Sequence, residues 1–127
     1  MGGAQVGAEG KVVLTASFIF TETDLDDEFF RLDQLIAQAA EDTDGFLGKE
    51  NWFSEDRKTR NSMYYWDNQA ALKAFSAHPS HIEAKKQYER WYGGFHVVIS
   101  EVTQSYGDGA LNHITPNNRP VRRPKTT

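Results

Sequence analysis

Two histidines, His78 and His81, flank a proline that interrupts a helical pattern. Pro79 disfavours helical angles at the residue before it, so a new helical segment is expected after the break. Ser80 and Glu83 match the capping-box pattern of a helix start, which places His81 at the first helical position. The positive end of the helix dipole and burial both favour the neutral imidazole there. A neutral histidine near pH 7 can act as a general base or bind a metal.

The same histidines also have a structural interpretation. His81 could be hydrogen-bonded near a helix start, and His78 could cap carbonyls at the end of the preceding helix. A His-x-x-His pair needs a third ligand to form a catalytic zinc or iron site. The spacing of Glu50, Glu83 and His96 singles out none of them, so we predict no dedicated metal site.

Large aromatic residues accompany this pair and predict an apolar pocket. Trp66 ends an aromatic strand-like segment, where it could wall a pocket or belong to the core. Asn51 is the one amide in another strand-like segment and could polarise a substrate carbonyl or lie at an exposed edge. We predict that His81, Trp66 and Asn51 are catalytic. The predicted substrate-binding residues are Phe18, Trp52, Tyr65, His78, Tyr88 and Trp91.

Other charged residues and motifs add little to this site. Lys85 and Arg90 could bind an acidic group of a ligand or be solvated helix charges. His96 is expected to face a partner subunit, and we assign no role to His113. The sequence has no glycine-rich phosphate loop, no nucleophile elbow and no cysteine. It therefore gives no support for flavin or nicotinamide binding.

The composition is that of one small globular domain. A chain of 127 residues, 39% hydrophobic and 13% aromatic, can fill one core. The absence of cysteine excludes disulfides and fits a reducing compartment, so we expect a cytoplasmic protein. The first ten residues lack a signal-peptide pattern, and no apolar run approaches the roughly 20 residues that span a bilayer. We expect no membrane association.

Charge is distributed unevenly along the chain. The net charge is −4, and from Gly107 onward four basic residues and Asp108 give +3, which leaves −7 for residues 1–106. An acidic body argues against nucleic-acid binding. The basic tail could be solvated or could touch the acidic surface of a second subunit. We divide the chain into a flexible N-terminus (1–10), a folded domain (11–106) and a tail or dimer arm (107–127).

Residue patterns predict the order βαββαβ. A strand over 11–20 is β-branched and aromatic on both faces. After a turn and N-cap over 21–24, a helix with one apolar stripe ends at Asp44-Gly45. The remaining elements are strands over 46–53 and 60–66, a helix capped by Asp67, broken at Pro79 and ending near Tyr92, and a strand over 95–106. The helix stripe consists of Leu25, Phe29, Leu32, Ile36 and Ala39.

This order is that of the α+β, ferredoxin-like plait, with an antiparallel four-stranded sheet. Helices cover one face of such a sheet. Because the predicted strands are apolar on both faces, we expect the other face to pack against a second copy, as in an isologous homodimer.

Several of these residues resemble the antibiotic biosynthesis monooxygenase superfamily over about residues 11–107. They are Tyr65-Trp66-Asp67, Ala71-Leu72, Phe75, His78-Pro79-x-His81, Trp91-Tyr92, Glu101-Val102 and Tyr106-Gly107. The resemblance implies a dimeric α/β barrel. It also implies monooxygenase activity on a small aromatic or polycyclic molecule, without flavin or nicotinamide.

The superfamily also includes haem-degrading members, and the chain departs from their pattern. Trp66 matches their strand-end tryptophan. Lys85 stands where they have the histidine that binds iron, and Ala16 or Ser17 where they have an asparagine. Haem is therefore an alternative ligand only, with His81 as the substitute for the missing histidine.

Two further interpretations stay open. The same pocket could serve an isomerase, cyclase or lyase that works through enolate chemistry, which oxygen consumption would distinguish. A non-catalytic ligand-binding dimer would instead pack His78 and His81 away from any cavity.

Overall fold

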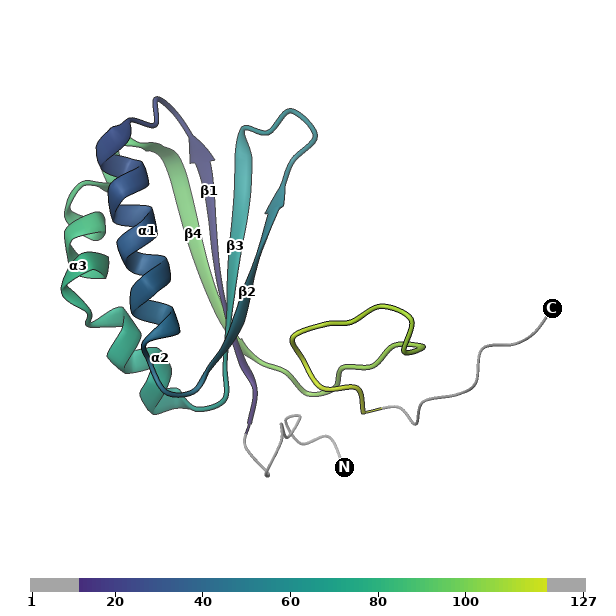
Figure 1. Cartoon of the computed structure of the whole chain (residues 1–127). Helices are drawn as coiled ribbons and strands as arrows, with labels where there is room; N and C mark the ends of the chain where they lie inside the picture. Colours follow the sequence, from purple (N-terminus) through teal and green to yellow (C-terminus); the bar gives the residue numbers. More distant parts are fainter. Residues whose placement is uncertain (1–11, 119–127) are drawn as a thin grey trace.

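The computed structural model describes residues 12–118 of the chain (Figure 1). The predicted order βαββαβ is confirmed, with the second helix in two pieces. The elements are β1 (Leu14–Glu22), α1 (Asp27–Glu41), β2 (Phe46–Phe53), β3 (Thr59–Trp66), α2 (Gln69–Ser76), α3 (Pro79–Lys86), the 3-10 turn η2 (Tyr88–Arg90) and β4 (Tyr92–Glu101). No helix within the described range is long and apolar enough to cross a membrane.

The four strands form one antiparallel sheet in the order β2-β3-β1-β4. All the helices lie on one face of this sheet (Figure 1). Ser17 of β1 lies opposite Met63 of β3 and Val98 of β4, and successive side chains point to opposite faces. The predicted ferredoxin-like fold is therefore confirmed, with one helix-bearing face and one helix-free face.

The first helix shows how the sequence sets this packing. Asp26 is the N-cap of α1, and it accepts a hydrogen bond from the backbone N–H of Phe29 at 3.0 Å. The cap therefore lies two residues after residue 24, the last position predicted for it. Phe29, Leu32 and Ala39 of the predicted stripe are buried against the sheet. The same Asp26 carboxylate accepts from the indole N–H of Trp91 at 2.9 Å, which joins the start of α1 to the start of β4.

Two separate clusters of buried residues hold the helices on the sheet. One gathers around Trp66, with Leu14, Leu72 and Phe75 among its members. The other gathers around Phe20, Phe29, Leu32 and Trp91. Leu14 pairs with Trp66, whereas Phe20 pairs with Arg60 six residues along, so the clusters lie toward opposite ends of the sheet. The space between them is where the candidate site lies.

Some predicted boundaries and caps were wrong. The first strand runs to Glu22 because its pairing with β3 and β4 continues past Phe20. The second half of the broken helix ends at Lys86, and β4 begins at Tyr92 and ends at Glu101 instead of spanning 95–106. Asn68 caps α2 in place of Asp67, because its side chain accepts from the N–H of Ala71 at 2.7 Å.

The described part of the tail, through Asn118, folds back onto its own chain. His113 Nε2 lies 3.0 Å from a carboxylate oxygen of Glu50, and the His113 ring packs edge-on against Tyr65. The side chain of Ile114 packs over the backbone of Gly48. The tail loop thus covers one end of the helix-free face of the same chain, and the predicted contact of the tail with a partner stays a prediction. The basic residues from Arg119 onward and residues 1–10 lie outside the described range.

Candidate functional site

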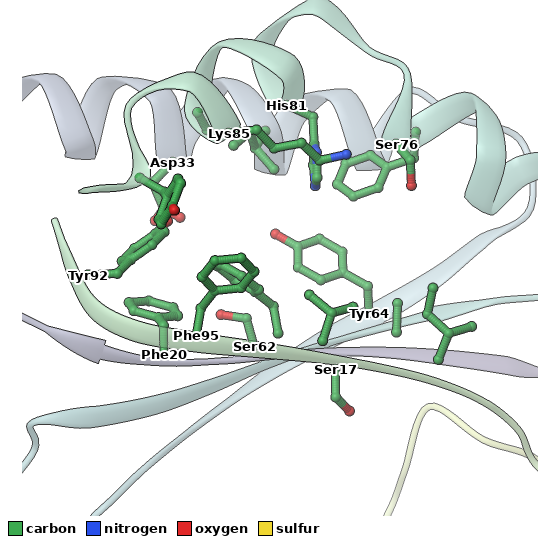
Figure 2. A pocket seen from close by; sticks show the side chains of 18 of the residues that line it. Ser17, Phe20, Asp33, Ser62, Tyr64, Ser76, His81, Lys85, Tyr92 and Phe95 are labelled. Atoms are coloured by element: carbon green, nitrogen blue, oxygen red, sulfur yellow. The ribbon is translucent and has the colours of Figure 1, made fainter. Parts of the chain in front are cut away.

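A cavity of about 500 Å³ lies between the helix-bearing face of the sheet and helices α2 and α3 (Figure 2). Its floor comes from alternate residues of the strands, such as Phe18, Tyr64 and Val97, and its roof comes from Phe75, His81 and neighbouring helical residues. Leu72 and Phe75 belong to the Trp66 cluster, and Phe20 belongs to the other cluster. The cavity is therefore walled by both cores. The remaining lining residues include Ala16, Asp33, Arg60, Ser62, Lys85, Tyr88, Tyr92, Phe95 and Ile99.

His81 enters the cavity from α3, where it is the third residue and not the first as predicted. Its imidazole packs edge-on against Phe75, with ring centroids 5.0 Å apart, and Phe75 in turn packs against Trp66 at 5.0 Å. His81 Nδ1 is buried without a hydrogen-bond partner. The other ring nitrogen, Nε2, is therefore the one that can meet a ligand.

The surroundings of His81 hold it neutral. Burial lowers the pKa of His81 to about 4, and the positive charge of Lys85 and the proximity of His78 add to this effect. Figure 2 shows the Lys85 side chain beside the imidazole, at the edge of the cavity. The predicted neutral imidazole thus has two main physical causes, burial and a neighbouring cation.

His78 has a different task. It is the N-cap of α3, and its Nδ1 accepts from the backbone N–H of Ser80 at 3.1 Å. The predicted capping box, with Ser80 as the cap, was wrong, because His78 supplies the acceptor two residues earlier. The alternative that His78 caps carbonyls of the preceding helix holds for its backbone, whose N–H donates to the carbonyl of Phe75 at 3.0 Å, while Ala77 is the C-cap of α2. His78 does not line the cavity.

Polar groups line the cavity away from His81. Figure 2 shows the Tyr64 hydroxyl pointing into the cavity, with Asp33 and Tyr92 toward the end away from His81. Burial raises the pKa of Tyr64 and of Tyr92 to about 12, so both phenols stay protonated and can donate hydrogen bonds at neutral pH. Arg60 reaches Asp33 with a long contact of 3.5 Å between Nη2 and Oδ1.

The structure brings three of the nine predicted site residues together. His81, Phe18 and Tyr88 all line the cavity. Trp66 and Trp91 are buried in the two cores, and Trp66 lies behind Phe75.

The other predicted residues lie elsewhere. Trp52 and Tyr65 are on the helix-free face, because they alternate with residues that line the cavity or face the helices. The Tyr65 hydroxyl donates to Glu50 at 2.6 Å, and burial together with this contact raises the pKa of Tyr65. Asn51 lies on the helix-bearing face but outside the lining. Its side-chain oxygen accepts from the hydroxyl of Ser62 at 2.7 Å, so it orients a residue that does line the cavity.

The polar lining residues that were not predicted include Asp33, Arg60, Tyr64 and Tyr92. A signal for two of them was present. Every second residue of β3 points to the same face. Arg60 and Tyr64 therefore share a face with Ser62 and Trp66. Asp33 has no such signal, because an acidic residue beside an apolar helix stripe usually faces solvent.

Among residues 12–118, no group of three or more histidine, cysteine, aspartate or glutamate side chains is arranged to hold a metal ion. Two of the residues considered as a third ligand for the His78–His81 pair lie elsewhere. His96 pairs with Ile19 on the helix-free face, and Glu50 is held by Tyr65 and His113.

Comparison with known proteins gives the family. The family model described as monooxygenase af470-like matches residues 20–118. The chain belongs to this family. The matched range includes most of the residues that line the cavity. The resemblance to antibiotic biosynthesis monooxygenases is confirmed at the family level. A search of curated protein sequences found no match.

Solved structures agree on the fold. SnoaB, a cofactor-independent oxygenase from Streptomyces nogalater, superposes with a TM-score of 0.62 at 15% identity, over 74% of this chain and 96% of SnoaB. A structure from Chloroflexus aurantiacus J-10-fl that carries the name of the antibiotic biosynthesis monooxygenases has a TM-score of 0.52 at 14% identity, over 75% of this chain and 95% of that one. A dabb family protein with a ferredoxin-like fold from Mesorhizobium loti has a TM-score of 0.52 at 15% identity, over 71% and 96%. At these identities the similarity establishes the fold alone.

Proposed function

We propose that this member of the monooxygenase family oxidises a small aromatic or polycyclic molecule in the cavity beside His81, without flavin or nicotinamide. The observation that carries the proposal is the placement of a neutral, buried imidazole in the wall of an otherwise largely apolar cavity. The cavity volume, about 500 Å³, lies within the range of roughly 300–1,000 Å³ typical of small-molecule sites. Aromatic lining residues such as Phe20, Phe95 and Tyr64 suit a flat ring system.

His81 would accept a proton from the substrate at Nε2. With a pKa of about 4, it is a weak base. Taking a proton from a phenol of pKa about 10 would be uphill by about 6 units, or about 8 kcal/mol. The substrate must therefore have a more acidic enol or phenol, or its anion must be stabilised. Lys85, next to His81, can stabilise that anion in a water-poor site.

Such a reaction balances without an external reductant. An electron-rich anion can give electrons to O₂ directly. When a ring methylene becomes a carbonyl, the substrate loses four electrons and two hydrogens. One oxygen atom enters the carbonyl, and the other leaves as water with those two hydrogens. The protein then needs only to bind the substrate, take the proton and keep bulk water away.

The lining does not fit haem well. Haem iron takes an axial ligand such as histidine, and His81 is the one histidine of the lining. A metal-bound imidazole almost always donates from its second nitrogen to a carboxylate, a carbonyl or water. His81 Nδ1 has no hydrogen-bond partner, so that support is missing. We assign no step to haem.

We also propose that the chain works as an isologous homodimer. Trp52 is 61% exposed and Val98 is 42% exposed, and both lie on the helix-free face beyond the part that the tail loop covers. Large apolar side chains exposed together on one face are typical of an interface. A second copy would cover them.

Oxygen uptake with a panel of hydroxylated tricyclic ketones tests the proposed reaction. Wild-type protein, freed of flavin and metal, should consume O₂, and His81→Gln should lower kcat at least about 100-fold, the lower range for loss of a general base. His78→Asn, which keeps an N-cap for α3 and lies outside the cavity lining, is the matched control and should keep most of the activity. Conversion without oxygen uptake would favour the isomerase, cyclase or lyase alternative. Full activity in His81→Gln would remove His81 as the base.

A further inference from the structure

Arg60 stands out among the residues that line the cavity. Its side chain is only 13% exposed, although it carries a permanent charge. The guanidinium lies over the ring of Phe20 at 4.7 Å and near that of Phe29 at 5.6 Å. These rings hold it at the end of the cavity away from His81, close to Asp33.

The hydrogen-bonding capacity of Arg60 is mostly unused. A guanidinium has five N–H donors. Its contact with Asp33, at 3.5 Å, is at the outer limit for a hydrogen bond, and its Nε is buried with no partner. A buried donor without a partner destabilises the fold, and more so when the donor is charged. Because Nε is closed off from the cavity, the Nη groups, held only by the long contact with Asp33, are the donors that a ligand with acceptors can reach.

The charge of the lining also favours an anion. Arg60 and Lys85 are cationic and Asp33 is the only carboxylate, so the lining carries a charge of +1 in a chain whose net charge is −4. The hydroxyls of Tyr64 and Tyr92 are further donors in the lining, and no acceptor among residues 12–118 binds either of them. An incoming anion would meet several donors and one competing charge.

We propose that the substrate carries a carboxylate and that Arg60 binds it in a bidentate manner, displacing the weak contact with Asp33. The inference rests on the proposed function of the cavity and narrows its substrate to an aromatic acid. Guanidinium and carboxylate match in shape, and such paired hydrogen bonds are about twice as strong as neutral ones. With the acid anchored at Arg60, the ring system extends over Tyr64 toward His81.

Two probes that differ only in this group test the inference by isothermal titration: 2-naphthoate and its neutral amide, 2-naphthamide. Wild-type protein should bind naphthoate at least about tenfold more tightly, as expected for charge-assisted hydrogen bonds. Arg60→Met should bind both probes equally, with its affinity for the amide unchanged. Arg31→Met is the matched control, because Arg31 pairs with Glu28 outside the cavity, and it should keep the preference.

A second variant, in which binding is expected to become tighter, keeps the inference testable if Arg60→Met does not fold. Asp33→Asn removes the competing carboxylate and should tighten naphthoate binding several-fold while leaving naphthamide binding unchanged, a result that misfolding cannot mimic. Equal affinities in wild type, a preference that survives in Arg60→Met, or no gain in Asp33→Asn would each overturn the inference while the aromatic site stands. If wild type binds neither probe, the proposed aromatic site fails, and this inference fails with it.

Discussion

His81 combines burial, a cationic neighbour and a ring contact in one position. Burial and Lys85 lower its pKa to about 4, and Phe75 holds the ring edge-on. The low pKa keeps the imidazole neutral, and it also makes the imidazole a weak base. An enzyme built this way suits substrates that are themselves acidic, and the cations at both ends of the cavity support the anion that results.

The pH dependence of turnover should reflect this low pKa. The lowered value means that the neutral form of His81 is fully present above about pH 5. We therefore expect kcat/KM to be level from pH 5.5 to 8 for a substrate that does not itself titrate in this range, because this ratio reports the free enzyme and the free substrate. A base with an ordinary histidine pKa of about 6.5 would retain only about a tenth of its activity at pH 5.5. A break near pH 6.5 would contradict our assignment of His81.

The same pKa predicts a loss of stability in mild acid. The pKa of His81 is about 4 in the folded chain and about 6.5 in the unfolded chain, so the unfolded chain binds more protons between these values. Stability is then lost as the pH falls through this window. From pH 7 to pH 5, the histidine should cost the wild type about 2 kcal/mol.

Urea unfolding at both pH values, compared between wild type and His81→Leu, isolates this contribution. The wild type should lose about 2 kcal/mol more than the variant over this interval, since the variant lacks the titrating group. Equal losses would show that His81 is not held neutral by its surroundings.

At the scale of the elements, the break between α2 and α3 places His81. Ala77 ends α2, and His78 starts α3 by accepting from the N–H of Ser80. His78 thus serves the site by setting where α3 begins. His78→Ala should destabilise the fold by about 1 kcal/mol through loss of the cap, whereas His78→Asn should keep most of the stability because asparagine is a good N-cap. Thermal unfolding measures both, and an unaffected Tm in His78→Ala would refute the role of the cap.

The sequence predicted the elements better than the site. Alternating apolar residues and the helix stripe sufficed for every strand and helix, because both periods are local properties. His81, Phe18 and Tyr88 were found by residue type and position. The places of Trp52 and Tyr65 depended on strand parity, which a shift of one residue in a strand reverses. Arg60 and Asp33 meet only through the packing of α1 on β3, 27 residues apart, and no local pattern reports that contact.

At the scale of the whole molecule, the helix-free face is where we expect a second copy to pack. The tail loop covers one part of this face through His113 and Ile114, and Val98 on β4 and Trp52 on β2 stay exposed. A charge there should prevent a second copy from packing. We expect the wild type to sediment as a dimer and Val98→Lys to sediment as a monomer with an unchanged circular dichroism spectrum. Wild type that sediments as a monomer at micromolar concentration would contradict the proposed dimer.

The most direct test of the central claim is the stoichiometry of the reaction in protein free of flavin, nicotinamide, haem and added metal. With a tricyclic substrate that has an acidic methylene and a carboxylate, we predict one O₂ consumed and one ¹⁸O atom from ¹⁸O₂ incorporated per carbonyl formed. No hydrogen peroxide should accumulate, and the rate should depend on His81. Product that takes its oxygen from water, or turnover that appears only after hemin is added, would contradict the account.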